Sequence, residues 1–386
     1  MNLSYLFQRK IKASFNIIFH SNFSLEYPKK SDLVLFDDNL SWFLDKYFKE
    51  KYTILHARHK KYNLRIVLKV LLKNKLRFTS LDYFNEYIKY VNPKIILTFS
   101  DNTPNYYKII KNHKTKKIFI QIAHRTSTQQ DIFFQSKLLE KTKKNQNVDH
   151  MLVFNEKIGK LYEKFINGKH TVIGSFRSNC YKKVKGNNFD LFFISTWRDH
   201  ALDFPITDSI PWKKFLDTQA KLIKYIYEYT KKNNRHLTIY GKYKEDKEKE
   251  FFIKVLGKEN RYWKYLNNTR ANSYNNLDKS KLVISSISSL GYECLARDTK
   301  VAFFNVYNFN KSTESKKFGW PYNLPKNGPF WTNELSQKSC NKFLSQVSKI
   351  KRNKWHNLKK KYSYLLKYDK NNKIFVKLVN KILKSP

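Results

Sequence analysis

The stretch that decides the fold is 281-KLVISSISSLGYECLARDTKVAFF-304. It begins and ends with short apolar runs typical of buried parallel strands, and the residues between them form a turn and then a helical pattern. Either Ser288 or Ser289 is placed to cap that helix. Strand, turn, helix and strand in this order predict one βαβ unit of a doubly wound sheet.

The start of this helix has the chemistry of a phosphate-binding site, because backbone N–H groups are unpaired there and the helix dipole favours an anion. We expect Gly291, in the first turn, to let a ligand come close. We expect Glu293, on the exposed side of that turn, to accept hydrogen bonds from two ribose hydroxyls. The competing interpretation is a plain cap, with Glu293 and Arg297 forming a surface pair worth about 0.2–0.5 kcal/mol. Helix starts in doubly wound sheets lie where such folds bind ligands, and this favours the binding site.

Units of the same kind continue outward in two series. The first series has expected strands at 31–37, 52–56, 94–100, 117–121 and 150–154, and expected helices at 41–51, 105–112 and 156–167. The second has strands at 190–195, 236–241, 281–286 and 300–304, and helices at 212–232 and 244–256. The change falls near 172–176. We therefore predict two Rossmann-like, doubly wound α/β domains facing a central cleft, residues 1–172 and 173–386, with a Lys-rich helical tail from Ser336 onward.

Composition is compatible with two such cores. The chain has 386 residues, of which 41% are hydrophobic and 16% aromatic. Its formal net charge of +45 suggests nucleic acid or an anionic membrane surface as a partner. The lysines are spread over the whole length, however, so a general compositional bias explains the charge equally well. We expect nucleic acid not to be the partner.

Other features bear on the compartment. Lys12 interrupts the apolar core that a secretory signal would need, and no stretch reaches the ~18 apolar residues of a spanning helix. The three cysteines, Cys180, Cys294 and Cys340, show no metal-ligand or redox-motif spacing. We expect a cytoplasmic protein, with peripheral attachment to the inner face of the membrane as a further expectation.

The residues from Ser288 to Arg297, with the strand at 300–304, resemble the donor-site element of a family of surface-carbohydrate and O-antigen biosynthesis proteins. Other segments of that family match at comparable intervals: 98–102, 119–121, 153–159 and 173–179. The resemblance covers roughly 33–305. Two departures stand out, since Ile122-Ala123 replaces the Asn-Gly expected after Gln121, and Asp298 stands where a glycine is usual.

That family is similar to GT-B enzymes, among them nucleotide-sugar transferases, the glycerophosphotransferases of teichoic acid synthesis and the hexosamine 2-epimerases. The resemblance implies a C-terminal domain that holds the nucleotide sugar, with Glu293 on the ribose and Ser288 and Ser289 at the diphosphate. It implies a glycosyltransferase acting on a glycan or lipid-linked acceptor. An epimerase or a glycerophosphotransferase on the same scaffold, and a basic nucleic-acid-binding protein, stay as alternatives.

A leaving nucleoside diphosphate develops negative charge, which metal-independent GT-B enzymes neutralise with cations and helix starts. Arg198 follows the strand ending at Ser195, Lys242 follows Gly241, and Arg177 lies at the interdomain connection. We expect these three cations at the donor, although any one lysine in so basic a chain can be there by chance. No metal and no other cofactor is expected, because the histidines lack carboxylate or cysteine partners at ligand spacing.

Inversion at an anomeric carbon needs a general base from the facing domain. Asp101 and His124 are the candidates, because each follows a buried strand and should rise at the cleft edge. A polar residue ending a strand is often only a turn former, so both roles compete with a structural one.

Overall fold

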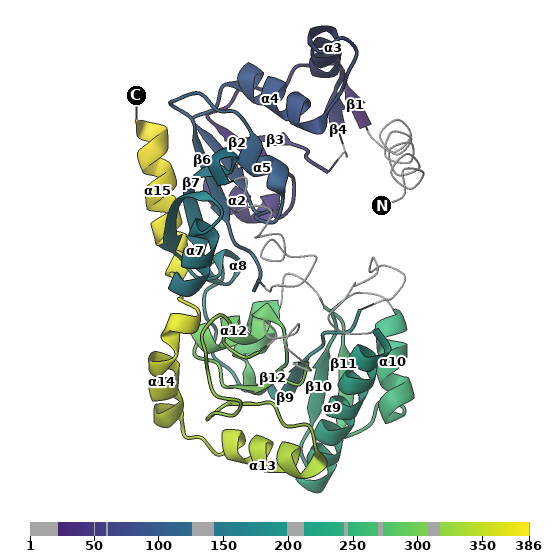
Figure 1. Ribbon diagram of the computed structural model, residues 1–386. Coiled ribbons are helices and arrows are strands. Elements are labelled where there is room, and N and C mark those ends of the chain that lie inside the picture. The colour runs from purple at the N-terminus through teal and green to yellow at the C-terminus, as the bar shows by residue number, and fades with distance from the viewer. Residues whose placement is uncertain are drawn as a thin grey trace.

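The computed structural model describes residues 22–49, 51–58, 61–125, 143–198, 212–242, 246–268, 273–307 and 317–385. Two α/β lobes lie one above the other, and the chain passes from the first lobe to the second near α8 (Phe176–Asn179) (Figure 1). Each lobe is built on one six-stranded sheet in which every pairing is parallel. The predicted fold class is therefore confirmed.

The sheet of the first lobe has the strand order β3-β2-β5-β6-β7-β8. Its strands are β2 (Leu33–Phe36), β3 (Thr53–Leu55), β5 (Ile95–Thr98), β6 (Lys116–Ile120), β7 (Asn147–Val153) and β8 (Asn167–Val172). The strands β2 and β5 are apolar and buried along their whole length, as expected of parallel strands covered on both faces.

Helices cover both faces of this sheet. They are α2 (Ser41–Phe48), α3 (Leu64–Lys73), α4 (Ser80–Val91), α5 (Pro104–Lys108) and α7 (Glu156–Glu163). Alternate residues of β2 belong to different apolar clusters: Val34 and Phe36 pack with α4, whereas Leu33 and Leu35 pack with α2. A small parallel pair, β1 (Asn22–Ser24) with β4 (Lys61–Asn63), lies outside the main sheet next to α3.

The sheet of the second lobe has the order β11-β10-β9-β12-β13-β14. Its strands are β9 (Phe189–Ile194), β10 (Leu237–Tyr240), β11 (Trp263–Leu266), β12 (Ser280–Ser285), β13 (Val301–Phe304) and β14 (Trp331–Thr332). Strands β10 and β11 lie on one side of β9, and strands β12, β13 and β14 lie on the other. The winding direction therefore reverses between β9 and β12, and such a reversal is where doubly wound folds bind their ligands.

The helices of the second lobe enclose one large apolar core. They are α9 (Trp212–Lys232), α10 (Asp246–Leu256), α11 (Ser273–Asp278), α12 (Ser289–Ala296), α13 (Gln337–Ser348) and α14 (Arg352–Lys361). After α12 the chain turns through Asp298 at φ 64°, the left-handed conformation for which a glycine is usual. The Asp298 carboxylate is held there by Arg352 at 2.6 Å.

The last helix, α15 (Lys373–Lys384), returns to the first lobe (Figure 1). Phe375 and Val379 are fully buried against the face of the sheet that carries Leu33 and Leu97. The sequence predicts that the whole tail belongs to the second domain, but α15 packs on the first lobe. The periodic pattern of the tail predicts a helix but not the sheet that the helix covers. The boundary between the domains stays a prediction.

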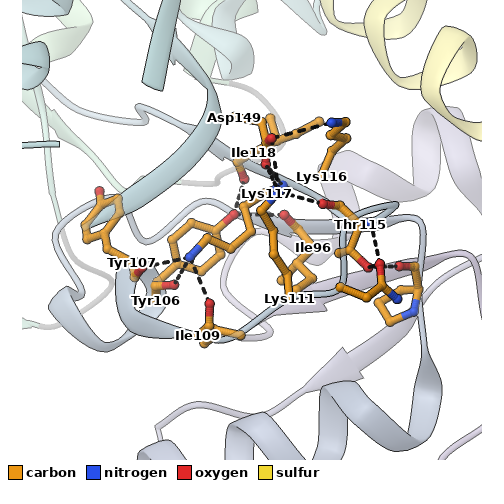
Figure 2. A network of polar contacts seen from close by, with 12 residues as sticks. Ile96, Tyr106, Tyr107, Ile109, Lys111, Thr115, Lys116, Lys117, Ile118 and Asp149 are labelled. Carbon is orange, nitrogen blue, oxygen red and sulfur yellow. Dashed lines mark hydrogen bonds and ion pairs between the residues drawn. The ribbon is translucent and has the colours of Figure 1, made fainter. Parts of the chain in front are cut away.

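Lys117 of β6 is a buried lysine whose ammonium group has three backbone acceptors (Figure 2). Its Nζ donates to the carbonyl oxygens of Tyr107 at 2.7 Å, Ile109 at 3.1 Å and Tyr106 at 3.3 Å. These carbonyls lie at the C-terminal end of α5, where a positive charge is favourable. Burial nevertheless lowers the pKa of Lys117 to about 7, because desolvation disfavours the ammonium form, and the nearby Lys111 adds to the effect.

We expect Lys117 to make the fold more stable as the pH rises above about 7. Below that pH the lysine is protonated in both states, and the cost of burying its charge is fully present. Above it the folded protein releases the proton, whereas the unfolded chain keeps it up to 10.5. Between roughly pH 7 and pH 9 the gain is on the order of 2 kcal/mol. Urea denaturation checks this, because Lys117→Met should lack that part of the rise; equal rises in both proteins would contradict it.

Candidate active site

The loops that follow β9 and β12 lie side by side at the reversal point of the second sheet. The hydroxyl oxygens of Thr196 and Ser286 are 3.4 Å apart, which joins the two loops. Both loops are at the carboxyl ends of their strands. The sequence-predicted candidates Arg198 and Ser288 are each two residues beyond this contact, so the fold brings both to the same edge of the sheet.

The start of α12 is capped as the sequence predicts. Ser288 is the N-cap residue, and its Oγ accepts a hydrogen bond from the Leu290 amide at 3.3 Å. Ser289 uses its side chain differently, since its Oγ accepts from the backbone amide of His124 at 2.8 Å. Among the described residues, the Ser289 amide has no acceptor of its own. This amide is one of the unpaired helix-start donors that suit an anion.

The contact between His124 and Ser289 joins the two lobes. His124 lies on the loop after β6, is partly exposed, and stacks its ring on that of Tyr292 with centroids 4.9 Å apart and planes 17° apart. Tyr292 belongs to α12, and its hydroxyl accepts from the Gly319 amide at 2.8 Å. His124 was expected at the edge of the first lobe that faces the second, and it contacts α12 there. Its catalytic role stays a prediction.

Asp101 does not lie at an accessible edge, and the expectation that it does is wrong. Its side chain is fully buried and forms a two-pronged ion pair with Arg125, with Arg125 Nε 2.8 Å from Oδ2. The hydroxyl of Tyr162 donates to the same carboxylate. A buried carboxylate needs such partners, and with them it has no free path to a substrate. The pair instead fixes the loop that carries His124.

Glu293 is also fully buried, so the expectation that it lies on the exposed side of α12 is wrong. Its Oε1 accepts from Ser175 Oγ at 2.5 Å, and its Oε2 accepts from the Tyr274 hydroxyl at 2.8 Å. The physical reason is that α12 is covered all round: residues 291–297 are buried without exception. Glu293 thus ties α12 to the segment that connects the lobes.

Arg177 lies in that connecting segment, beside Glu293. Its guanidinium is 3.7 Å from the carboxylate, and its side chain is 29% exposed. Although burial disfavours its charge, the Glu293 carboxylate raises the pKa of Arg177 above its usual value. Its Nε is buried without a partner in the part of the chain that the structure describes. Arg177 therefore keeps donor capacity that Glu293 does not use.

Gly291 serves the packing of the helix, and the expectation that it opens space for a ligand is wrong. A Cβ at this position would meet Ser285 Oγ at 2.4 Å and Phe303 Cε1 at 2.6 Å, atoms of β12 and β13. The glycine lets α12 lie close on its own sheet, which brings the helix start nearer to the strand ends.

The remaining cations differ in their surroundings. Arg198 is partly buried and forms no hydrogen bond or ion pair with another described residue. Lys242, after β10, is exposed; its amide donates to Glu248 and its carbonyl accepts from Asn268. Within the described ranges, no group of three or more His, Cys, Asp or Glu side chains could hold a metal ion.

The model of a family described as "putative O-antigen biosynthesis protein" matches residues 118–383, well over half of the chain. The chain belongs to this family. The match begins later than the resemblance that we had traced from residue 33, and it continues through the C-terminal tail. No curated protein matches the sequence.

Solved structures show that the chain has the GT-B fold. A "putative UDP-N-acetylglucosamine 2-epimerase" from Listeria monocytogenes has a TM-score of 0.56 at 10% identity, covering 92% of this chain and 98% of its own. S. aureus MnaA with UDP has a TM-score of 0.55 at 11% identity, and the match covers 93% of this chain and 99% of MnaA. The wall teichoic acid polymerase TagF, soaked with CDPG, has a TM-score of 0.52 at 10% identity, and the match covers 100% of this chain and 99% of the TagF chain.

Sequence reasoning missed several residues that shape the site. Arg125 neutralises Asp101, and Ser175 and Tyr274 hold Glu293. Arg125 could have been found from the sequence, because it directly follows His124 at the end of a predicted strand and an arginine there is a natural ion-pair partner for a nearby aspartate. Tyr274 had no such sequence signal, because it belongs to a helix of only six residues and is nineteen positions from Glu293 along the chain.

Proposed function

We propose that this protein transfers a sugar from a nucleotide-sugar donor to a glycan or lipid-linked acceptor during surface-polysaccharide assembly. The observation that carries the proposal is the start of α12, which lies at the reversal point of the second sheet and contacts the His124 loop of the first lobe. Family membership and the GT-B fold support the same activity.

The donor belongs at the second lobe. The Ser289 amide and the dipole of α12 offer an anion site, and Arg198 lies on the neighbouring loop with its charge unpaired within the described residues. An arginine can bind a diphosphate through two parallel hydrogen bonds. The nucleoside would extend from there over the second sheet, toward Lys242.

The leaving nucleoside diphosphate gains negative charge as the bond between the anomeric carbon and its phosphate oxygen breaks. We propose that Arg198, Arg177 and the amides of α12 neutralise this charge, so that the reaction needs no metal ion. The guanidinium of Arg177 is partly exposed, and this supports the proposed division of labour. Fixed donors aimed at developing charge contribute more than mobile water, because they need no reorganisation during the reaction.

The acceptor belongs at the first lobe. We propose that His124 removes the proton from the acceptor hydroxyl as its oxygen attacks the anomeric carbon, which fits an inverting transfer. The buried Asp101–Arg125 pair keeps the loop in place, and stacking on Tyr292 orients the ring. These residues position the base and do not touch the substrate.

We further propose that the reaction takes place on the cytoplasmic side of the membrane. Within the described residues, none of the helices combines the length and the apolar character that crossing a bilayer requires. A lipid-linked acceptor would then have to be met at the membrane surface. The excess of basic residues, +45 in formal charge, supports attraction to anionic lipid.

Thermal denaturation with a panel of UDP, GDP, CDP and CMP sugars tests the donor site. Sugars of one nucleotide class should raise the melting temperature. Arg198→Ala should lower the affinity for that nucleotide about 10- to 100-fold, because a charged hydrogen bond of ~1.5–3 kcal/mol is lost. Arg261→Ala, which removes an exposed arginine of the same lobe, is the matched control and should bind normally. Polyphosphate serves as a control for general charge effects.

The products that the protein forms from the stabilising nucleotide sugar then distinguish a glycosyltransferase from an epimerase and a phosphotransferase. Transfer to an acceptor with release of nucleoside diphosphate supports the proposal. Conversion of the sugar nucleotide to its 2-epimer without an acceptor would replace it with an epimerase, and release of a nucleoside monophosphate with glycerol phosphate transfer would indicate a phosphotransferase. Stabilisation by polyphosphate alone would contradict all three.

A further inference from the structure

Helix α3 carries leucines that point away from the protein. Leu68 is 57% exposed, Leu72 is 79% exposed, and Leu76, just after the helix, is 78% exposed. At 100° per residue, Leu68 and Leu72 lie opposite Ile66 and Val70, which are buried in the first lobe. A helix that packs only on this lobe would carry polar residues at those outer positions.

The turn after α3 keeps Leu76 on the outside. Lys75 and Leu76 both have positive φ values, 50° and 62°, a backbone conformation that side-chain-bearing residues rarely adopt. The Leu76 amide donates to the Leu71 carbonyl at 2.7 Å, which fixes this turn. Leu68 and Leu72 thus form an exposed ridge one turn apart on α3, and Leu76 is exposed in the turn that follows the helix.

Cations flank the ridge. From residue 61 to residue 77 the chain has six Lys and Arg residues and no Asp or Glu: Lys61, Arg65, Lys69, Lys73, Lys75 and Arg77. Lys69 and Lys73 are paired with Glu86 of α4, at 2.6 and 3.6 Å. Arg65 lies over the Tyr27 ring at 5.0 Å. Lys75 and Arg77 are exposed beside Leu76, so the charge next to the ridge is positive.

We propose that this surface, formed by Leu68, Leu72, Leu76, Arg65, Lys75 and Arg77, docks the protein on a membrane containing anionic lipid. We call it the α3 surface. Its leucines enter the boundary between headgroups and acyl chains, while its cations contact lipid phosphates. Charge complementarity favours this occupant over a second copy of the chain, whose α3 surface would bring like charges together. The inference rests on the membrane association proposed above and gives it a location.

The α3 surface lies at the end of the first lobe remote from the second lobe (Figure 1). Docking there would hold the acceptor lobe against the bilayer and leave the donor lobe in the aqueous phase.

Sedimentation with vesicles of phosphatidylcholine, alone or in equal parts with phosphatidylglycerol, tests the inference. The wild type should bind the anionic vesicles, and Leu68→Gln with Leu72→Gln should lower the partition coefficient by about tenfold or more. Glutamine keeps the helix propensity of leucine, so α3 should stay folded. Ile110→Gln, at a residue that is 72% exposed elsewhere on the same lobe, is the matched control and should bind like the wild type.

Charge is tested separately. Lys75→Glu with Arg77→Glu should reduce binding about tenfold or more, since each basic residue near the surface contributes ~5-fold. Lys349→Glu with Lys351→Glu changes the net charge equally on the second lobe and should have little effect. Equal losses in both pairs, unchanged binding of the leucine variant, or wild-type dimers that the leucine variant abolishes would each overturn the proposal. Nucleotide is absent throughout, so failure of the donor site would leave these results unaffected.

Discussion

Replacing His124 with asparagine is expected to lower the turnover number about 10²- to 10⁴-fold, the contribution typical of a general base. Asparagine cannot take the acceptor proton, but it keeps the backbone amide that donates to Ser289 Oγ at 2.8 Å. Donor affinity should therefore change little, and the loss should appear in the rate. Initial rates of nucleoside diphosphate release, with the donor found by thermal denaturation, measure the effect.

The chain offers a matched control for this change. His113 is exposed on a loop before β6, at the opposite end of that strand from His124, and His113→Asn should leave the rate unchanged. If His124→Asn keeps near-normal turnover, the proton must go to another group and the assignment of the base is wrong. If donor binding fails instead, His124 serves the interface between the lobes and not the chemistry.

The second large effect is expected on stability. Asp101→Asn should lower the free energy of unfolding by about 3–5 kcal/mol, because it leaves the buried Arg125 without its countercharge. The Tyr162 hydroxyl would also lose a charged acceptor. Urea denaturation at neutral pH measures the change, and Asp217→Asn, at an exposed position of α9, should alter it little.

A double variant sharpens this test. Arg125→Met combined with Asp101→Asn removes both charges, and it should recover a large part of the stability that the single variant loses. Loss of activity in Asp101→Asn without loss of stability would contradict a structural role. It would restore Asp101 as a candidate for the base.

Much of the fold could be predicted because the buried strands of parallel sheets have a recognisable sequence pattern. Their strands are short apolar runs, and those at β2, β5, β9 and β12 were located to within a few residues. Helix α9 was predicted with its observed bounds. The less apolar strands were harder, because the pattern of β8, NGKHTV, lacks a continuous apolar run and was not recognised.

For the candidate site, backbone features could be predicted from the sequence, but the exposure of side chains could not. Backbone-based features were predictable: the capping serine of α12, the strand-end loops and the position of His124 follow from strand order and chain direction. Side-chain exposure was not. Asp101 was expected at the cleft edge because it follows a buried strand, and Glu293 was expected on the exposed side of the first turn of α12. Their burial depends on Tyr274, Ser175 and Arg125, partners that only the tertiary structure brings near.

The proposed transfer reaction depends most on the start of α12 holding the diphosphate. A crystal structure with the stabilising nucleoside diphosphate bound is the most direct test. We predict that a phosphate oxygen accepts a hydrogen bond from the Ser289 amide, with Arg198 against the same diphosphate and His124 facing it from the first lobe. A diphosphate bound elsewhere, with Ser289 and Arg198 in contact with protein alone, would contradict it.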